Sequence, residues 1–211
     1  MHSLRRDCLD KLLEFNKEYF RGKILDLGGK KEGRRGNFDI SKYSAEVTYL
    51  NTDDSTCPDI NSSAENIPIE DNTFDCVIAT ELLEYISDPK VVMEEVYRVM
   101  KVDGHALISV PLLHPIHGDY NYDKLRFTEG YLQALSNEIG FKKYEIQIMG
   151  SVGSVIFDIL KVSFGYAGNS SLKGVFGYIL FILKPFFRLL DKMTENQKRF
   201  INTGYFIILK K

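Results

Sequence analysis

Short apolar runs, each closed by polar or turn-forming residues, recur along most of the chain. Runs of this length, bounded by glycine, proline, asparagine or aspartate, are typical of buried β-strands. The runs are KILDLGG at 23–29, VTYLN at 47–51, FDCVIAT at 74–80, HALISVP at 105–111 and KYEIQIM at 143–149. A further short strand is expected near 59–61, and the final run, TGYFIILKK at 203–211, is expected at or near the edge of the sheet.

Apolar residues at helical spacing separate several of these runs. Residues 3–20 predict an amphipathic helix that covers the sheet or a ligand pocket. Its expected inward face is formed by Leu4, Cys8, Leu12, Phe15 and Tyr19. Two further helices are predicted, one beginning at Asp88-Pro89 and one running from the capping residue Thr128 to Gly140. Strands that alternate with helices indicate an α/β fold with a mostly parallel sheet covered on both faces.

Residues 151–192 form an apolar, aromatic segment before the last run. We interpret it as a helical insertion, because apolar residues recur at helical spacing from Leu172 onward and continue on the opposite face. The uncharged stretch 174–183 has 10 residues, well short of the ~20 needed to span a bilayer. Three roles remain open for 151–190: an internal cap over the sheet, a homodimer or partner surface, and peripheral contact with a membrane.

Composition is that of an ordinary globular protein. With 211 residues, 44% of them hydrophobic and 27% charged, the chain is long enough for a single α/β domain over 1–211, with 1–20 as its covering helix. The formal net charge of -2 gives no electrostatic case for a nucleic-acid partner. The three cysteines form no CxxC pair, and their odd number argues against a disulfide framework. Because the charged N-terminus also lacks the apolar core of a signal peptide, we expect a cytoplasmic protein.

Candidate chemistry gathers at the ends of the predicted strands. Asp26 lies in a buried run, where a carboxylate is costly unless a polar group meets it. The turn Gly28-Gly29 follows directly, and glycine lets a ligand approach the backbone closely. About 21 residues further along, Asp53 and Asp54 close the second strand, a position that suits a pair of ribose hydroxyls. In open α/β sheets, ligands bind at this edge.

The series ILDLGG, YLNTDD, SSAENIPIEDNTFDCVIATELLEYISDP and RVMKVDGHALISVP resembles the class I S-adenosylmethionine-dependent methyltransferases. The resemblance covers about residues 20–145 and is strongest to a small subgroup found with polysaccharide biosynthesis. It implies a Rossmann-like sheet of seven strands, mostly parallel with the last strand antiparallel, and helices on both faces. It also implies that S-adenosylmethionine is the cofactor.

The resemblance assigns cofactor contacts to residues that follow three of the strands. They are Asp26, Gly28 and Gly29 at the methionine end, Asp53 with its neighbour Asp54 at the ribose, Ser63, Ala64 and Glu65 at the adenine, and Thr80 and Glu81 at the closing wall. The chain departs from the family pattern in four places. Lys30 and Glu32 stand where glycines are usual, Ser63 where an acid is usual, and Tyr85 where histidine is common. A degenerate, non-catalytic binding module on the same fold is therefore an alternative.

The loop at 112–127 is the expected acceptor region. Methyl transfer from a sulfonium mainly requires positioning, and a hydroxyl acceptor also benefits from a general base. His117 is the first candidate for that base and His114 the second, and ordering the loop through hydrogen bonds is an equal alternative for each of them. The expected acceptor is a small-molecule or glycan hydroxyl, and an N-methyltransferase acting on a small metabolite is the alternative. No metal site is predicted, since the two histidines lack a third ligand.

Three further residues of this loop are candidates for substrate binding. They are Asp119, Asp123 and Arg126. Asp123 and Arg126 can pair with each other or orient the substrate, and a guanidinium is well suited to meet a carboxylate or phosphate.

Overall fold

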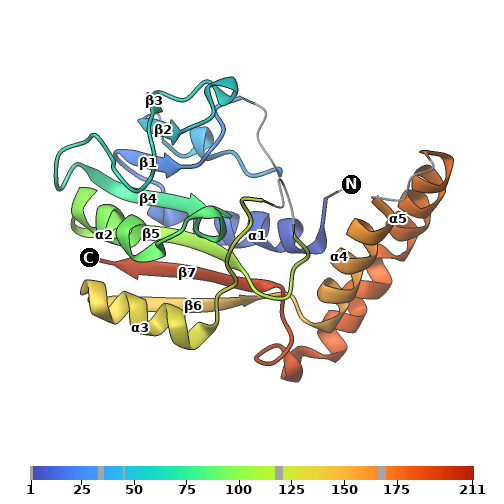
Figure 1. Cartoon of the computed structure of the whole chain (residues 1–211). Helices are drawn as coiled ribbons and strands as arrows, with labels where there is room; N and C mark the ends of the chain where they lie inside the picture. Colours follow the sequence, from blue (N-terminus) through green and yellow to red (C-terminus); the bar gives the residue numbers. More distant parts are fainter. Residues whose placement is uncertain (1, 33–35, 45, 117–120, 166–169) are drawn as a thin grey trace.

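The computed structural model describes residues 2–32, 36–44, 46–116, 121–165 and 170–211. These residues form a seven-stranded sheet in the order β3-β2-β1-β4-β5-β7-β6 (Figure 1). The strands are β1 Ile24–Leu27, β2 Val47–Asn51, β3 Ile60–Asn61, β4 Phe74–Thr80, β5 Met100–Pro111, β6 Lys143–Met149 and β7 Gly204–Lys210. β1 to β5 pair in parallel, and β7 is antiparallel to both of its neighbours. The predicted methyltransferase-like sheet is confirmed.

The last strand lies near the edge of the sheet, as expected, but it does not form the edge itself. β7 lies between β5 and β6 and pairs with both along its whole length, so it is not an edge strand. The physical reason is visible in its composition, because every residue from Gly204 to Leu209 is buried. A strand that is apolar on both faces is typical of the interior of a covered sheet.

The described residues include five α-helices. They are α1 Leu4–Phe15, α2 Pro89–Val99, α3 Glu129–Ile139, α4 Val152–Gly165 and α5 Ser170–Met193. Of these, α1, α2 and α3 flank the sheet. α2 and α3 pack their apolar residues on one face of the sheet, in a cluster that includes Val96 and Leu135. α1 packs on the other face through Leu9 and Leu13. The two sides of the sheet are thus closed by different helices, as the alternating pattern predicts.

The ends of α2 and α3 follow from local sequence. Asp88 accepts a hydrogen bond from the backbone N–H of Lys90, and proline occupies the next position of α2. Thr128 caps α3 by accepting from the N–H of Tyr131, and Gly140 ends that helix with φ of +98°. Each side-chain cap contributes about 1 kcal/mol of helix stability.

α1 is shorter than predicted, and its expected inward face is confirmed in part: Leu4 is buried, and Cys8, Leu12 and Tyr19 pack partly buried against the core. It ends at Phe15, after which a short 3₁₀ turn covers Lys17–Tyr19. Leu9 and Leu13 are fully or almost fully buried, whereas Phe15 is 77% exposed. Phe15, the last residue of α1, is therefore the one member of the expected face that points to solvent.

α4 and α5 form a helical hairpin that extends away from the sheet (Figure 1). Phe157 of α4 packs on Phe187 of α5, with ring centroids 5.4 Å apart. Gly153 permits this approach, since a Cβ there would lie 2.1 Å from the carbonyl oxygen of Phe187. Asp7 of α1 pairs with Lys184 of α5, Oδ2 to Nζ, at 2.7 Å, and so anchors the hairpin to the domain.

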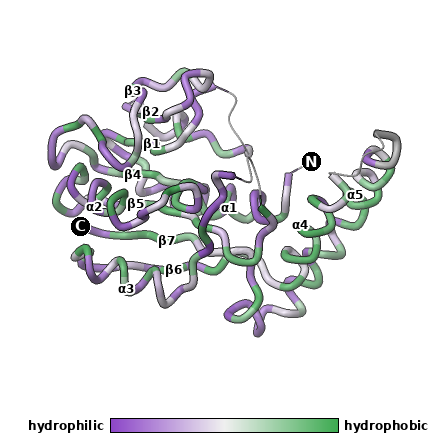
Figure 2. The backbone as a smooth tube through the Cα atoms, viewed as in Figure 1, coloured by the Kyte–Doolittle hydropathy of each residue, from purple (hydrophilic) through white to green (hydrophobic). Residues whose placement is uncertain are grey.

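The hairpin is rich in apolar residues along most of its length (Figure 2). Among the described residues, none of the helices is both long and apolar enough to cross a membrane.

Candidate active site

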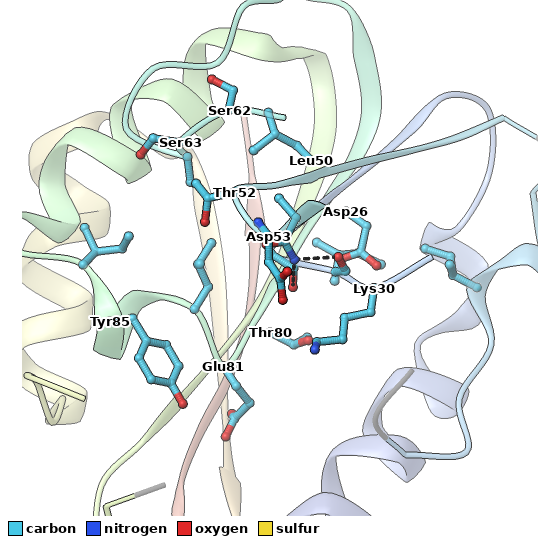
Figure 3. Close-up of a pocket in the computed structure, with 18 of the residues that line it drawn as sticks. Asp26, Lys30, Leu50, Thr52, Asp53, Ser62, Ser63, Thr80, Glu81 and Tyr85 are labelled. Atoms are coloured by element: carbon cyan, nitrogen blue, oxygen red, sulfur yellow. Dashed lines mark hydrogen bonds between the residues drawn. The ribbon is translucent and has the colours of Figure 1, made fainter. Parts of the chain in front are cut away.

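A cavity of about 680 Å³ opens at the carboxyl ends of β1, β2 and β4 (Figure 3). Its wall combines residues that follow these strands with residues of α1 and of the segment after β3. Eight of the residues predicted from the sequence line it, namely Asp26, Gly28, Gly29, Asp53, Ser63, Ala64, Thr80 and Glu81. The fold therefore brings together residues from four separate stretches of the chain.

The turn after β1 is held by an amide. Asn51 Nδ2 donates to the carbonyl oxygen of Gly28 at 3.1 Å and to that of Gly29 at 2.9 Å. Gly28 has φ of +72°, a conformation that favours glycine. A Cβ on Gly29 would lie 2.2 Å from Cγ of Asp26, so only glycine lets the turn fold over that carboxyl group.

Asp26 lies under this turn and lines the cavity. Burial raises the pKa of its carboxyl group to about 7. No charge or hydrogen-bond donor from the described residues offsets that rise. A buried carboxyl group without such an offset is costly, and a cationic ligand in the cavity would relieve the cost.

Asp53 stands at the end of β2 on the exposed side of the cavity (Figure 3). Its Oδ1 accepts from the Ser55 hydroxyl at 2.6 Å and from the Ser55 backbone N–H at 3.0 Å. These hydrogen bonds lower the pKa of the Asp53 carboxyl, so the group is ionised at neutral pH. Asp54, the neighbouring candidate, does not line the cavity, and its carboxylate accepts from the Asn61 amide.

The segment after β3 contributes the hydroxyls of Ser62 and Ser63 and the buried methyl of Ala64. Ser63 Oγ lies 3.2 Å from Glu65 Oε2 and also accepts from the Glu65 backbone N–H. Glu65 is exposed and is not part of the cavity wall. Of the three residues expected at the adenine, Ser63 and Ala64 therefore line the cavity. Glu65 does not line it and only contacts Ser63.

Glu81 follows Thr80 at the end of β4 in a left-handed conformation, with φ of +54°. A non-glycine residue in this region is strained and persists where its surroundings hold it. Arg5 holds it with two hydrogen bonds, one of them from Nε to Oε2 at 2.9 Å, and Ser109 Oγ donates at 2.7 Å. Burial acts to raise the pKa of Glu81, but the charge and hydrogen bonds of Arg5 outweigh it and keep the pKa below its ordinary value.

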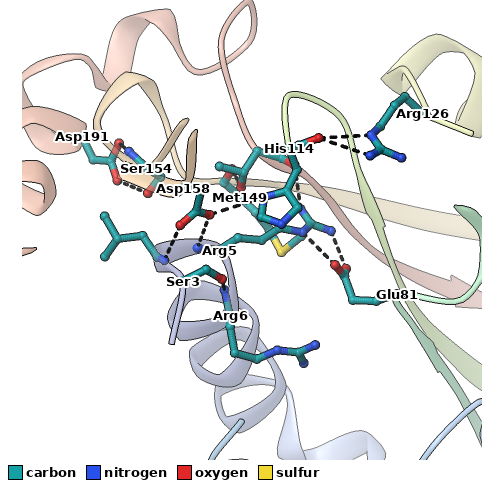
Figure 4. A network of polar contacts seen from close by, with 12 residues as sticks. Ser3, Arg5, Arg6, Glu81, His114, Arg126, Met149, Ser154, Asp158 and Asp191 are labelled. Atoms are coloured by element: carbon teal, nitrogen blue, oxygen red, sulfur yellow. Dashed lines mark hydrogen bonds and ion pairs between the residues drawn. The ribbon is translucent and has the colours of Figure 1, made fainter. Parts of the chain in front are cut away.

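Arg5 is also the centre of a buried network between α1 and α4 (Figure 4). Its guanidinium donates to the carbonyl oxygen of Thr203 at 2.8 Å. Asp158 of α4 accepts from the backbone N–H groups of Leu4 at 2.8 Å and Arg5 at 3.1 Å, at the positive end of the α1 dipole. The network joins the wall of the cavity to the helical hairpin.

Of the two histidine candidates, only His114 belongs to the described residues, and it is not brought to the cavity. His114 does not line it and is almost completely buried, with Nδ1 at 3.5 Å from Oδ2 of Asp158. This packing favours the role of ordering the loop, and a catalytic role for His114 stays a prediction. His117 and Asp119 lie outside the described residues.

Asp123 and Arg126 pair with each other. Arg126 Nη2 donates to Asp123 Oδ2 at 2.9 Å, and a second bond joins Nη1 to Oδ1. The same guanidinium donates from Nη2 to the carbonyl oxygen of His114 at 3.2 Å. Neither residue lines the cavity, so the pair ties the loop together, and contact with a substrate stays a prediction.

Several cavity residues were not found from the sequence. Arg6 and Asp10 come from α1, where their spacing of four residues places them on one helical face. Tyr122 adds an aromatic side chain, and Asn51 holds the glycine turn. Tyr85, noted in the sequence only as a departure from the family pattern, also lines the cavity. The signal in the sequence is the polar face of α1, opposite the apolar residues that predict the helix.

Comparison with known proteins agrees with this geometry. Residues 31–108 match the family model of a methyltransferase domain. A ubiquinone/menaquinone biosynthesis C-methyltransferase of Haemophilus ducreyi is 36% identical over 66 residues, which are 30% of this chain and 26% of that protein. The match therefore spans about a quarter of the length of that curated relative.

Solved structures match over far more of the chain. A SAM-dependent methyltransferase from Archaeoglobus fulgidus has a TM-score of 0.62 at 18% identity, covering 98% of this chain and 94% of that one. Phosphoethanolamine N-methyltransferase 2 of Haemonchus contortus, solved with S-adenosyl-L-methionine, has a TM-score of 0.57 at 14% identity, covering 95% of this chain and 52% of that one.

The comparisons show that the chain has the fold of the S-adenosylmethionine-dependent methyltransferases and that residues 31–108 match a methyltransferase domain. The narrower subgroup associated with polysaccharide biosynthesis stays a prediction.

Proposed function

We propose that this chain transfers the methyl group of S-adenosylmethionine to an acceptor that carries an apolar or aromatic group. The observation that carries the proposal is the alignment of Asp26, the Gly28-Gly29 turn, Asp53 and Ser63 along one cavity. Its volume of about 680 Å³ falls within the roughly 300–1,000 Å³ of small-molecule sites.

The residues of the cavity fit the chemistry of the cofactor at both ends. Asp26 has a buried carboxyl group that a ligand ammonium would compensate. Asp53 is ionised and can accept hydrogen bonds from two ribose hydroxyls. When bound, S-adenosylmethionine supplies an electrophilic methyl group on a sulfonium. The chain itself supplies binding, orientation and exclusion of water, which is the main requirement for such a displacement.

Part of the cavity wall is apolar and aromatic. Leu82, Tyr85, Ile86 and Tyr122 line it, and among the described lining residues there is no histidine. Glu81 is held by Arg5 and Ser109, which leaves it poorly suited to remove a proton. An aromatic and aliphatic wall favours an acceptor with an apolar ring or chain.

Two acceptor chemistries are compatible with this wall. Methylation of a small-molecule or glycan hydroxyl is the sequence-based expectation and would use His117 as base. Methylation of a ring carbon is supported by the name of the curated C-methyltransferase relative and by the tyrosines of the wall. Mass spectrometry of the methylated product distinguishes an O-methyl from a C-methyl group. An unchanged rate in His117→Ala would argue against the first chemistry.

Calorimetric titration with S-adenosylmethionine and S-adenosylhomocysteine tests the cofactor site. We expect Asp53→Ala to weaken binding roughly thirtyfold, because about 2 kcal/mol of charge-assisted hydrogen bonding is lost. Asp54→Ala is the matched control, since its neighbouring carboxylate lies outside the cavity wall, and it should bind like the wild type. Equal losses in both variants, or no heat from the wild type, would reject the proposed site.

The pKa of Asp26 predicts a pH dependence of cofactor binding. Below about pH 7 its carboxyl group is neutral, and above that pH it is ionised and attracts the ammonium of the cofactor. Affinity should therefore rise roughly tenfold between about pH 5.5 and 7.5, a range in which the α-amino group stays mostly protonated. The measurement is the same titration at both pH values. Asp26→Asn should remove most of the rise, and a pH profile unchanged by this substitution would contradict the assignment.

A further inference from the structure

The outward face of α5 carries a continuous apolar surface. We define the outer stripe as Val175, Tyr178, Ile182, Phe186, Leu189 and Met193, which recur at intervals of three or four residues. Each of these side chains is between 55% and 74% exposed. A row of this length is unusual on a protein surface that faces only water.

Packing of the hairpin does not use the outer stripe. The inward face of α5 buries Leu180 and Phe187 against Phe157 of α4 and Leu4 of α1. Lys184 then fixes α5 to Asp7. The hairpin is therefore held by its inner face, and the exposed apolar residues are available for a partner.

Charge indicates which partner fits. Residues 151–200 contain seven basic and three acidic residues, a formal charge of +4, whereas the rest of the chain carries -6. Of the acids, Asp158 is buried, Asp191 accepts from Ser154 within the hairpin, and Glu195 pairs with Lys198. The exposed basic residues that remain around the outer stripe include Lys173, Lys192 and Arg199.

We propose that the outer stripe docks on the surface of a membrane that contains anionic lipids. An amphipathic helix with basic flanks and large apolar side chains lies in the headgroup region and buries its apolar face there. Lysine and arginine beside it are attracted to anionic headgroups. A second copy of this chain is a poorer occupant, since pairing of two such faces brings basic residues from both copies together.

Docking would also set the cavity relative to the bilayer. α1 contacts the hairpin through Asp7, while Arg6 and Asp10 on the same helix line the cavity. β1, β4 and β5 point their carboxyl ends toward the hairpin (Figure 1). The inference about the acceptor rests on the proposed methyl transfer: given that activity, the acceptor is a lipid or a lipid-linked molecule taken from the membrane surface.

Co-flotation of the whole chain with vesicles tests the docking surface. Vesicles of phosphatidylcholine with about a third phosphatidylglycerol should bind the protein, and binding should weaken in high salt because the charges are screened. Ile182→Glu/Phe186→Glu should lower vesicle affinity by at least roughly tenfold. Val102→Glu is the matched control, since Val102 is an exposed apolar residue of β5 at the far end of the sheet.

Three outcomes would overturn the docking proposal. The first is that the wild type does not bind the anionic vesicles, and the second is that Val102→Glu loses as much vesicle affinity as Ile182→Glu/Phe186→Glu. The third is that the wild type binds no vesicles but forms a stable dimer in light scattering, which Ile182→Glu/Phe186→Glu abolishes. Calorimetry with S-adenosylmethionine on the same variants separates this test from the proposed function. A variant that binds the cofactor normally but not the vesicles supports docking, and vesicle binding without cofactor binding rejects only the methyl transfer.

Discussion

Arg5→Ala is expected to lower the free energy of unfolding by about 3–5 kcal/mol at neutral pH. The substitution leaves the Glu81 carboxylate buried without its charged partner and removes the hydrogen bond to the Thr203 carbonyl. Urea denaturation followed by circular dichroism measures the change. Arg21→Ala, at an exposed arginine, should cost less than about 1 kcal/mol and serves as the control.

The pH dependence of this effect has a defined sign. In the wild type the pKa of Glu81 lies below its ordinary value of 4.5. The ion pair with Arg5 therefore stabilises the fold above pH 4.5, and this stabilisation is lost as the pH falls through the lowered pKa. In Arg5→Ala, burial without the partner raises the pKa instead. The stability difference between the two proteins should therefore shrink between pH 7 and about pH 4.5. A difference that stays constant or grows would show that the pair is not the cause.

Gly29→Ala is expected to weaken cofactor binding roughly a hundredfold while the protein stays folded. The added methyl would lie 2.2 Å from Cγ of Asp26, so either this side chain or the turn must move into the cavity. Overpacking of this kind costs about 3 kcal/mol at its upper end, which corresponds to about two decades in Kd. Calorimetric titration with S-adenosylmethionine gives the affinity, and circular dichroism reports the fold.

Gly130→Ala provides a matched comparison. Gly130 lies in α3, and a Cβ there meets no atom within 4 Å. Alanine should be tolerated or even stabilise the helix by about 0.5–1 kcal/mol, with unchanged cofactor affinity. Wild-type affinity in Gly29→Ala would mean that the turn does not contact the cofactor.

Local sequence signals predicted the parts of the fold that depend on neighbours along the chain. The strand at Ile24–Leu27 and its glycine turn could be predicted because an apolar run, a carboxylate and two glycines are adjacent in the sequence. The caps at Asp88 and Thr128 follow from side-chain chemistry one to three residues away. Residues at strand ends converge on one cavity because parallel strands end at one edge.

Features set by distant contacts were not predictable in the same way. Arg5 reads as a surface residue in a helix, and only the fold brings it to Glu81, 76 residues away. The place of β7 between β5 and β6 depends on which strands remain unpaired in the folded sheet. An apolar run in the sequence does not show which strands those are. His114 is buried beside Asp158 of a helix that follows 38 residues later.

The place of β7 between β5 and β6 has a consequence for the order in which the sheet is assembled during synthesis. β1 to β5 meet their parallel neighbours as soon as β5 has emerged, so the half of the sheet that bears the cavity can pair early. β6 has only β7 as a neighbour, and β7 begins 55 residues after β6 ends. At a translation rate of roughly 5–20 residues per second, β6 waits several seconds for its partner. During that interval β6 is on the nascent chain without its only sheet partner, so this edge of the sheet is completed last.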